Sequence, residues 1–236
     1  MNLYPLNLVL AVALAAVTLF FGYLPTRRLT ARFFTRWTLR FGGMWLAAAA
    51  LTPPEILHYY VLLALVCFIA WWWLHGGHGL GGKIWLGLAA GFGLSLGPVL
   101  ILAVTPGAWP DALPAWAQTL FLASLYTGGA IPGLAFVLFL FTRREGIDTG
   151  VEPSGYAKFL VALLFVRAFI ALINFCAIQE NVFGLVSYFL LLPILGRMAS
   201  RRVKSPRPST AGPVLWTIIV LGFMAEVWAL SCYRGL

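Results

Sequence analysis

The sequence predicts an all-helical integral membrane bundle with about eight membrane crossings. Of the 236 residues, 61% are hydrophobic and 10% are charged, whereas a soluble domain carries about 25% charged residues. Several apolar stretches reach the ~20 residues that a helix needs to cross the hydrocarbon core. Because no polar stretch is long enough to bury a core of its own, residues 1–236 are expected to form a single membrane domain.

The charge balance points to a membrane surface and away from nucleic acid. The chain has 16 Lys and Arg residues against 7 Asp and Glu residues, for a net charge of +9. These basic residues gather in short loops beside apolar spans, which is the pattern that orients a protein in a membrane. The expected partners are therefore the lipid bilayer and its anionic headgroups, and no nucleic acid.

The apolar spans follow one another along the whole chain. They are expected at residues 4–24, 37–52, 56–74, 84–104, 115–141, 156–178, 182–196 and 213–232. Pro25 ends the first span, and Pro53 ends the second, which is short. Three tryptophans, Trp71 to Trp73, close the third span and suit an interfacial position. The fifth span is longer than the hydrocarbon core, so it must tilt, kink or break, most readily at residues 127–133.

A basic segment, residues 26–40, follows the first span and overlaps the start of the second. Four of its arginines fall at steps of four, beside a row of large apolar residues at the same spacing. The arginines are Arg28, Arg32, Arg36 and Arg40, and the apolar row is Leu29, Phe33, Trp37 and Phe41. On a helix these rows form adjacent stripes, which predicts a helix lying in the headgroup layer on anionic lipid. The alternative is a positively charged anchor without a helix.

The positive-inside rule supports eight crossings with both termini on the outer side. The loops after the first, third, fifth and seventh spans then face the cytoplasm. They carry the basic clusters at 27–40, 143–144 and 197–207 together with Lys83 and Lys158. The outer segments carry Glu55, Asp111 and Glu180 and one base, Arg234. Omitting the short second span would move the later clusters outside. A bacterial inner membrane is the simplest location for such a chain.

Two ionisable residues lie deep inside apolar spans. Arg167 is near the middle of the sixth span, and Glu226 lies within the eighth. An arginine keeps its charge in a protein, and an unpaired charge at the centre of a helix costs about 2.5–3.5 kcal/mol on insertion scales. We therefore expect the two side chains to meet, with Asn174 on the same face as Arg167. The pair either joins the two helices permanently, or binds an anion at Arg167 while Glu226 accepts a proton.

Glycine and proline interrupt the fourth and fifth spans. Broken helices expose backbone groups that bind substrate in transporters. The expected interruptions comprise Gly97 and Pro98 in the fourth span and Gly128, Gly129 and Pro132 in the fifth. Polar groups on the fifth span, Thr127, Ser124 and Gln118, would add to the same site. The alternative is ordinary close packing, because glycine and proline are common in membrane helices.

The sequence carries no catalytic motif that we recognise and no metal-ligand spacing, and no cofactor is expected. Its three cysteines are scattered, and His75 with His78 on a glycine-rich loop would make a poor metal site. Three hypotheses remain. The first is a small inner-membrane transporter or solute-binding protein with a small anionic solute. The second is a non-catalytic subunit with a protein partner on the cytoplasmic face. The third is a lipid-modifying enzyme that uses interfacial residues such as Glu55 and His58.

Overall fold

The protein is a bundle of helices in the part that the computed structural model describes. The described residues are 4–22, 31–52, 56–75, 80–103, 114–142, 153–178, 182–205 and 207–232. No strand occurs in these ranges. Four helical segments are long and apolar enough to cross a membrane: Ala115–Thr142, Pro153–Ala177, Val182–Val203 and Pro208–Leu230. Four shorter apolar stretches lie at Leu8–Phe20, Leu39–Leu51, His58–Trp71 and Ile84–Val99.

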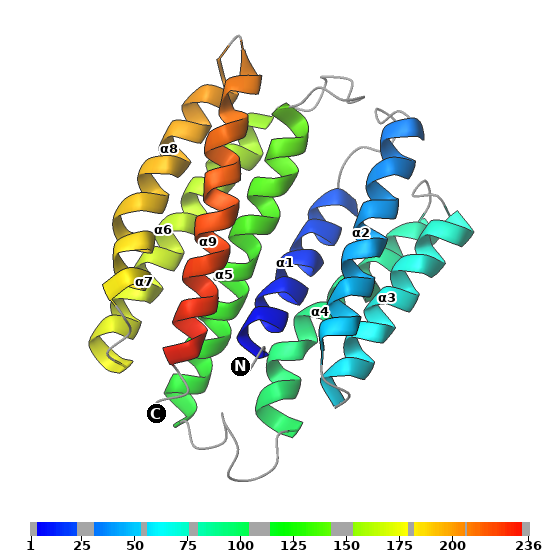
Figure 1. Ribbon diagram of the computed structural model, residues 1–236, viewed down its shortest axis with the longest axis horizontal. Coiled ribbons are helices and arrows are strands. Elements are labelled where there is room, and N and C mark those ends of the chain that lie inside the picture. Colours follow the sequence, from blue (N-terminus) through cyan, green and yellow to red (C-terminus); the bar gives the residue numbers. More distant parts are fainter. Residues whose placement is uncertain are drawn as a thin grey trace.

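The first four helices form one side of the bundle (Figure 1). They are α1 (Tyr4–Gly22), α2 (Ala31–Leu51), α3 (Ile56–His75) and α4 (Leu80–Ala103). α3 packs along α4 and α2, while α1 packs against α4 and continues the bundle toward α5. Their shared core is apolar and rich in large aromatic side chains, of which Trp45, Trp71 and Phe41 are among the most deeply buried.

The remaining helices form the other side (Figure 1). They are α5 (Ala115–Thr142), α6 (Pro153–Ile178), α7 (Val182–Val186), the π-helical turn η2 (Ser187–Leu191), α8 (Leu192–Val203), the 3-10 turn η3 (Pro208–Ala211) and α9 (Gly212–Cys232). α5 is the central helix, because it packs against α1, α6 and α9. Its most apolar window is 72% buried, against 33–44% for the other three long spans.

Glycines on α5 allow this central position. A Cβ atom on Gly129 would lie 2.6 Å from Val12 Cγ1, and one on Gly133 would lie 2.9 Å from the Ala13 carbonyl oxygen. Both distances are too short for a real side chain, so only glycine lets the α1 and α5 backbones approach this closely. This is the small-residue packing that membrane helices use in place of a hydrophobic driving force.

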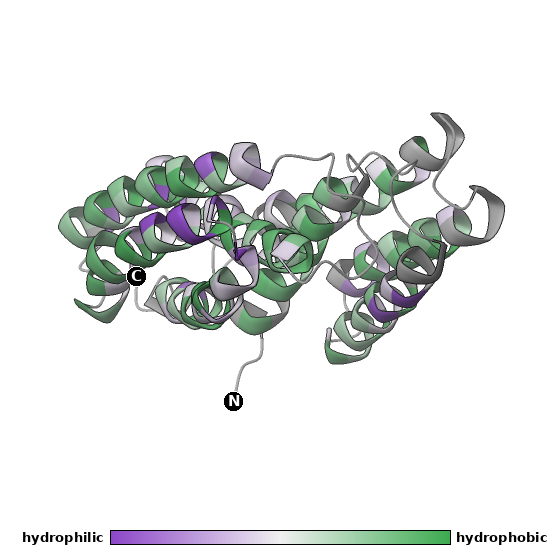
Figure 2. Ribbon diagram, turned by 90° about the horizontal axis from the view of Figure 1, so that it is seen from above, coloured by the Kyte–Doolittle hydropathy of each residue, from purple (hydrophilic) through white to green (hydrophobic). Residues whose placement is uncertain are grey.

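The surface of the bundle is apolar and its charged pair is inside, the reverse of a soluble protein. Hydrophobic residues predominate on the described parts of the helices (Figure 2). On α9, Trp216, Val220, Met224 and Trp228 recur at steps of four and are each about half exposed. In water, so large an apolar stripe would be an unusual surface. The four long apolar helices are therefore compatible with an integral membrane protein.

The expected helix interruptions are absent. α4 runs without a break through Gly97 and Pro98, and α5 runs through Gly128, Gly129 and Pro132. Pro98 removes the donor that would bond the carbonyl four residues earlier, on Leu94. The Tyr126 hydroxyl on α5 donates to that carbonyl oxygen at 2.7 Å. A neighbouring helix thus supplies the missing hydrogen bond, which is how membrane helices tolerate proline.

The described part of the basic segment, residues 31–40, does not form a separate interfacial helix. Residues 31–40 and the expected second span form one helix, α2, and Arg28 lies outside the described residues. Trp37 and Phe41 of the apolar row pack on the protein, because both are buried and their rings meet the Phe136 ring edge-on at 5.6 and 6.0 Å. Arg36 and Arg40 are exposed, and the structure describes the backbone but not the side chain of Arg32.

The seventh span is longer than expected. Helical structure continues from Val182 to Val203, although the expected span ended at residue 196. Arg197, Arg201 and Arg202 therefore lie on the last turns of α8 and not in a flexible loop. Helix C-termini favour positive charge, which explains why a run of arginines can extend the helix.

Candidate functional site: a buried charge network

Arg167 on α6 and Glu226 on α9 contact each other in the interior of the bundle. Arg167 Nε donates to Glu226 Oε2 at 3.0 Å, and Arg167 Nη2 lies 3.0 Å from the same oxygen. Both side chains are 0% exposed. The structure therefore brings together the two charged residues that the hydropathy pattern singled out. Neither charge faces lipid, so each is compensated where it is buried.

Tyr188 completes the network and was not anticipated from the sequence. Its hydroxyl oxygen lies 2.7 Å from Glu226 Oε2 and 3.1 Å from the Gly222 carbonyl oxygen, so its single proton can be donated to either acceptor. Its ring lies against the Arg167 guanidinium, with Cζ 4.2 Å from the ring centroid. Tyr188 thus contacts both charges, as a hydrogen-bond donor to one and as a cation–π partner to the other.

A π-helical turn carries Tyr188. The Leu192 N–H donates to the Ser187 carbonyl oxygen, five residues earlier, which defines the wide turn η2. Pro193 follows at once; it has no N–H to donate and its ring would crowd the carbonyl four residues before it. Widening the turn accommodates that ring. Both Ser187 and Tyr188 are fully buried as a result, and such turns are frequent at functional sites.

Gly128 on α5 provides the space for the Glu226 carboxylate. A Cβ atom placed on Gly128 would overlap Cδ and Oε2 of Glu226. On α9, by contrast, a Cβ on Gly222 would lie 3.5 Å from Ile131 Cγ2, which is ordinary van der Waals contact. The sequence analysis expected Gly128 to interrupt a helix. The structure instead assigns it a packing role, because only a residue without a side chain leaves room for the carboxylate.

Of the other expected binding residues, Asn174 and Ser124 contact each other, Thr127 bonds to its own helix, and Gln118 lies farther along α5. Asn174 Nδ2 donates to Ser124 Oγ at 2.8 Å, and both residues are 0% exposed, so they form a second buried contact between α6 and α5. The Thr127 hydroxyl donates to the Ala123 carbonyl oxygen at 2.6 Å on its own helix. Gln118 is only partly buried and lies about 15 Å from Gly128 at the helical rise. The structure therefore places Gln118 away from the charge network.

Three buried side-chain oxygen atoms in the described part of the chain have unused hydrogen-bonding capacity. Within the described ranges, Glu226 Oε1, Asn174 Oδ1 and Ser187 Oγ have no hydrogen-bond partner. A buried acceptor without a donor costs about 1–3 kcal/mol. The two carboxylate oxygens of Glu226 are thus unequal, since Oε2 accepts from Arg167 and Tyr188.

The described residues hold no cluster of three or more His, Cys, Asp or Glu side chains that could bind a metal. Cys67 is buried and Cys176 is exposed, and both are free thiols. His58 is partly buried, whereas Glu55, its expected partner in a lipid-modifying site, lies outside the described residues.

Comparisons with protein-family models, with characterised proteins and with solved structures find no match to this chain. Any functional interpretation therefore rests on the residues and their geometry.

Proposed function

We propose that this chain is a small inner-membrane transporter or solute-binding membrane protein whose site is the Arg167–Glu226–Tyr188 network. The observation that carries the proposal is the enclosed charge pair, in which one carboxylate oxygen accepts two hydrogen bonds and the other accepts none among the described residues. Placing a charged side chain inside a membrane costs free energy, and ionisable residues there most often mark ion, proton or solute pathways.

The network suggests a charge-conserving exchange. A small anionic solute that reaches Arg167 would replace Glu226 as the partner of the guanidinium. The released carboxylate would then take up one proton, since two negative charges beside one positive charge are unfavourable at this depth. The buried site would keep zero net charge before and after the exchange. Anion and proton would therefore move together.

We further propose eight membrane crossings with both termini on the outer side. The sorting of basic residues supports this arrangement, as do four long and four shorter apolar helical stretches. α2 is a helix of 21 residues, of which Leu39–Leu51 form the apolar part. In Figure 1, α1 begins and α9 ends at the same end of the bundle, as an even number of crossings requires.

One observation favours a second function. Arg167, Glu226 and Tyr188 are all 0% exposed, which suits a permanent connection between α6, η2 and α9. In that case the chain would be a non-catalytic subunit of a larger complex, and the arginines at the end of α8 would contact a partner on the cytoplasmic face.

Proteoliposomes containing trapped pyranine, a pH-sensitive dye, separate the two functions. The liposomes are supplied in turn with acetate, succinate and inorganic phosphate, and proton uptake is followed for wild type, Glu226→Gln and Arg167→Gln. Gly222→Ala is the matched control, since its Cβ has room. The transporter proposal predicts anion-dependent proton uptake that both charge variants lose and the control retains. Uptake equal to that of empty liposomes with all three anions would contradict it.

A further inference from the structure

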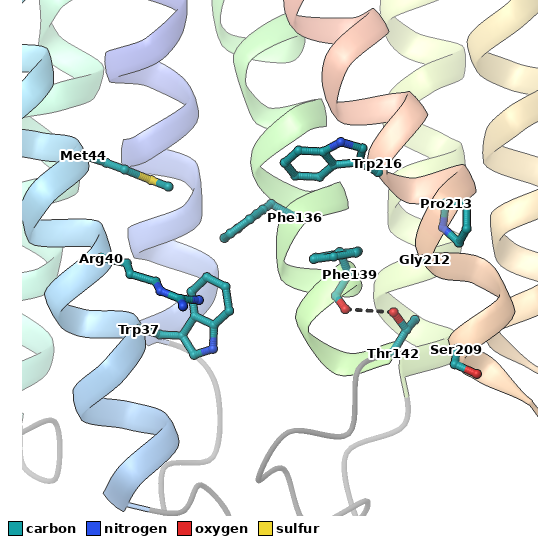
Figure 3. Close-up of a pocket in the computed structure, with 10 residues that line it drawn as sticks. All are labelled: Trp37, Arg40, Met44, Phe136, Phe139, Thr142, Ser209, Gly212, Pro213 and Trp216. Carbon is teal, nitrogen blue, oxygen red and sulfur yellow. Dashed lines mark hydrogen bonds between the residues drawn. The ribbon is translucent and has the colours of Figure 1, made fainter.

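A groove of about 810 Å³ separates α2 from α5 and α9 near one end of the bundle. Figure 3 shows Trp37, Arg40 and Met44 on the α2 side, facing Phe136, Phe139 and Trp216. Its volume falls within the range of about 300–1,000 Å³ that is usual for small-molecule sites. None of these residues belongs to the charge network, so the groove is a separate feature.

The lining changes from polar to apolar along the helices. The outer part has the hydroxyls of Thr142 and Ser209 and the guanidinium of Arg40. One turn deeper on each helix the lining is apolar, since Met44 follows Arg40 on α2 and Trp216 follows the start of α9. The groove is therefore polar near the end of the bundle and apolar deeper inside. This order suits an amphiphile whose charged head faces the water.

The polar end is positively charged. Arg40 is exposed, and its guanidinium carbon lies 4.6 Å from the centroid of the Trp37 ring. The buried indole holds the guanidinium by a cation–π contact without neutralising it. In the described part of the chain, Arg40 has no carboxylate partner. The guanidinium keeps its positive charge, and arginine binds phosphate oxygens well.

We propose that this groove binds one anionic phospholipid of the bilayer. Its phosphate contacts Arg40, and one acyl chain lies over Met44, Phe136 and Trp216. A soluble anion would leave the deep aromatic part of the groove facing hydrocarbon, whereas a lipid fills both parts. The bound lipid joins α2 to α5 and α9. This inference does not depend on the proposed transport function, because no residue is shared with the charge network.

Two substitutions and one control test the site. Arg40→Gln removes the charge that contacts the phosphate. Arg36→Gln, one turn earlier on α2, removes another exposed charge that does not line the groove. Gly212→Leu fills the groove. A Cβ there would lie 3.7 Å from the Phe139 ring, and the backbone angles of −52° and −53° suit any residue.

Native mass spectrometry of the full-length protein in detergent would measure binding of phosphatidylglycerol and phosphatidylcholine with identical oleoyl chains. Arg40→Gln should weaken phosphatidylglycerol binding about fivefold, the effect of one basic residue at an anionic lipid. Arg36→Gln should leave it nearly unchanged, and Gly212→Leu should weaken the binding of both lipids. Equal losses in Arg40→Gln and Arg36→Gln would mean general surface attraction and would overturn the proposal. Unchanged phosphatidylglycerol binding in Gly212→Leu would overturn it too.

Discussion

Adding a single methyl group at Gly128 should disrupt the charge network. In the Gly128→Ala variant, the new Cβ overlaps the Glu226 carboxylate, so the carboxylate must move away from α5. That movement breaks the bonds at 3.0 Å from Arg167 and at 2.7 Å from Tyr188. The substitution therefore tests the pair without removing either charge.

The expected change in the free energy of unfolding of Gly128→Ala follows from two limits. Forcing a methyl group into a packed interior costs about 1–3 kcal/mol. Leaving a buried charge without its partner costs about 3–5 kcal/mol. The two terms are not additive, because moving the carboxylate relieves the overlap and creates the unpaired Arg167. Alanine also favours the helix by about 1 kcal/mol over glycine. The net free energy of unfolding should fall by about 2–4 kcal/mol.

Gly222→Ala is the matched control for this measurement. It is the same substitution in a helix that carries the network, but its Cβ meets only an ordinary contact at 3.5 Å. The gain in helix propensity cancels in the comparison, so the difference between the two variants isolates the displaced carboxylate. SDS titration in mixed micelles, followed by circular dichroism, gives both unfolding free energies. A Gly128→Ala variant as stable as Gly222→Ala would refute the reasoning.

Two further substitutions test individual hydrogen bonds by the same titration. Tyr188→Phe removes the hydroxyl that donates to Glu226 at 2.7 Å but keeps the ring against Arg167, so the free energy of unfolding should fall by about 1–3 kcal/mol. An unchanged free energy of unfolding would mean that the hydroxyl does not stabilise the network. Ser124→Ala removes the oxygen that accepts the hydrogen bond from Asn174 at 2.8 Å. The free energy of unfolding should fall by about 0.6 kcal/mol, the average for a side-chain hydrogen bond between membrane helices. A loss as large as that of Gly128→Ala would mean that the Asn174–Ser124 contact and the charge network are coupled.

The sequence was sufficient to predict the charged contact, for a physical reason. Hydropathy locates helices long enough to cross a membrane, and a charge inside such a helix must find a partner. Arg167 and Glu226 were the ionisable groups deep in comparable spans, so their contact followed by elimination. The position of Arg167 also predicted which face of α6 lies toward the bundle. Asn174 is on that face and donates to Ser124.

Tyr188 could not be found in this way. Tyrosine is common in membrane proteins, and its direction depends on a π turn that no simple periodicity reveals. Pro193, five residues later, was the available signal, because a proline inside an apolar span requires some local adjustment. A tyrosine about one and a half turns before such a proline was therefore worth considering as a buried hydrogen-bond donor.

The glycines and prolines were ambiguous because they serve two purposes in membrane helices. At Pro98 the expected break did not occur, since Tyr126 on the next helix bonds the freed carbonyl oxygen. At Gly128 the absence of a side chain makes room for a carboxylate from α9. Both outcomes depend on a partner helix more than 25 residues away in the sequence, so local patterns could not decide between a break and close packing.

A double-mutant cycle on Arg167 and Glu226 measures the buried pair most directly. Arg167→Met and Glu226→Gln each remove one charge, and each should destabilise the folded protein by about 3–5 kcal/mol because the other charge stays buried. The double variant should lose much less than the sum of the two, since no charge remains unpaired. If the losses add to within about 0.5 kcal/mol, the two side chains do not interact and the proposed network is wrong.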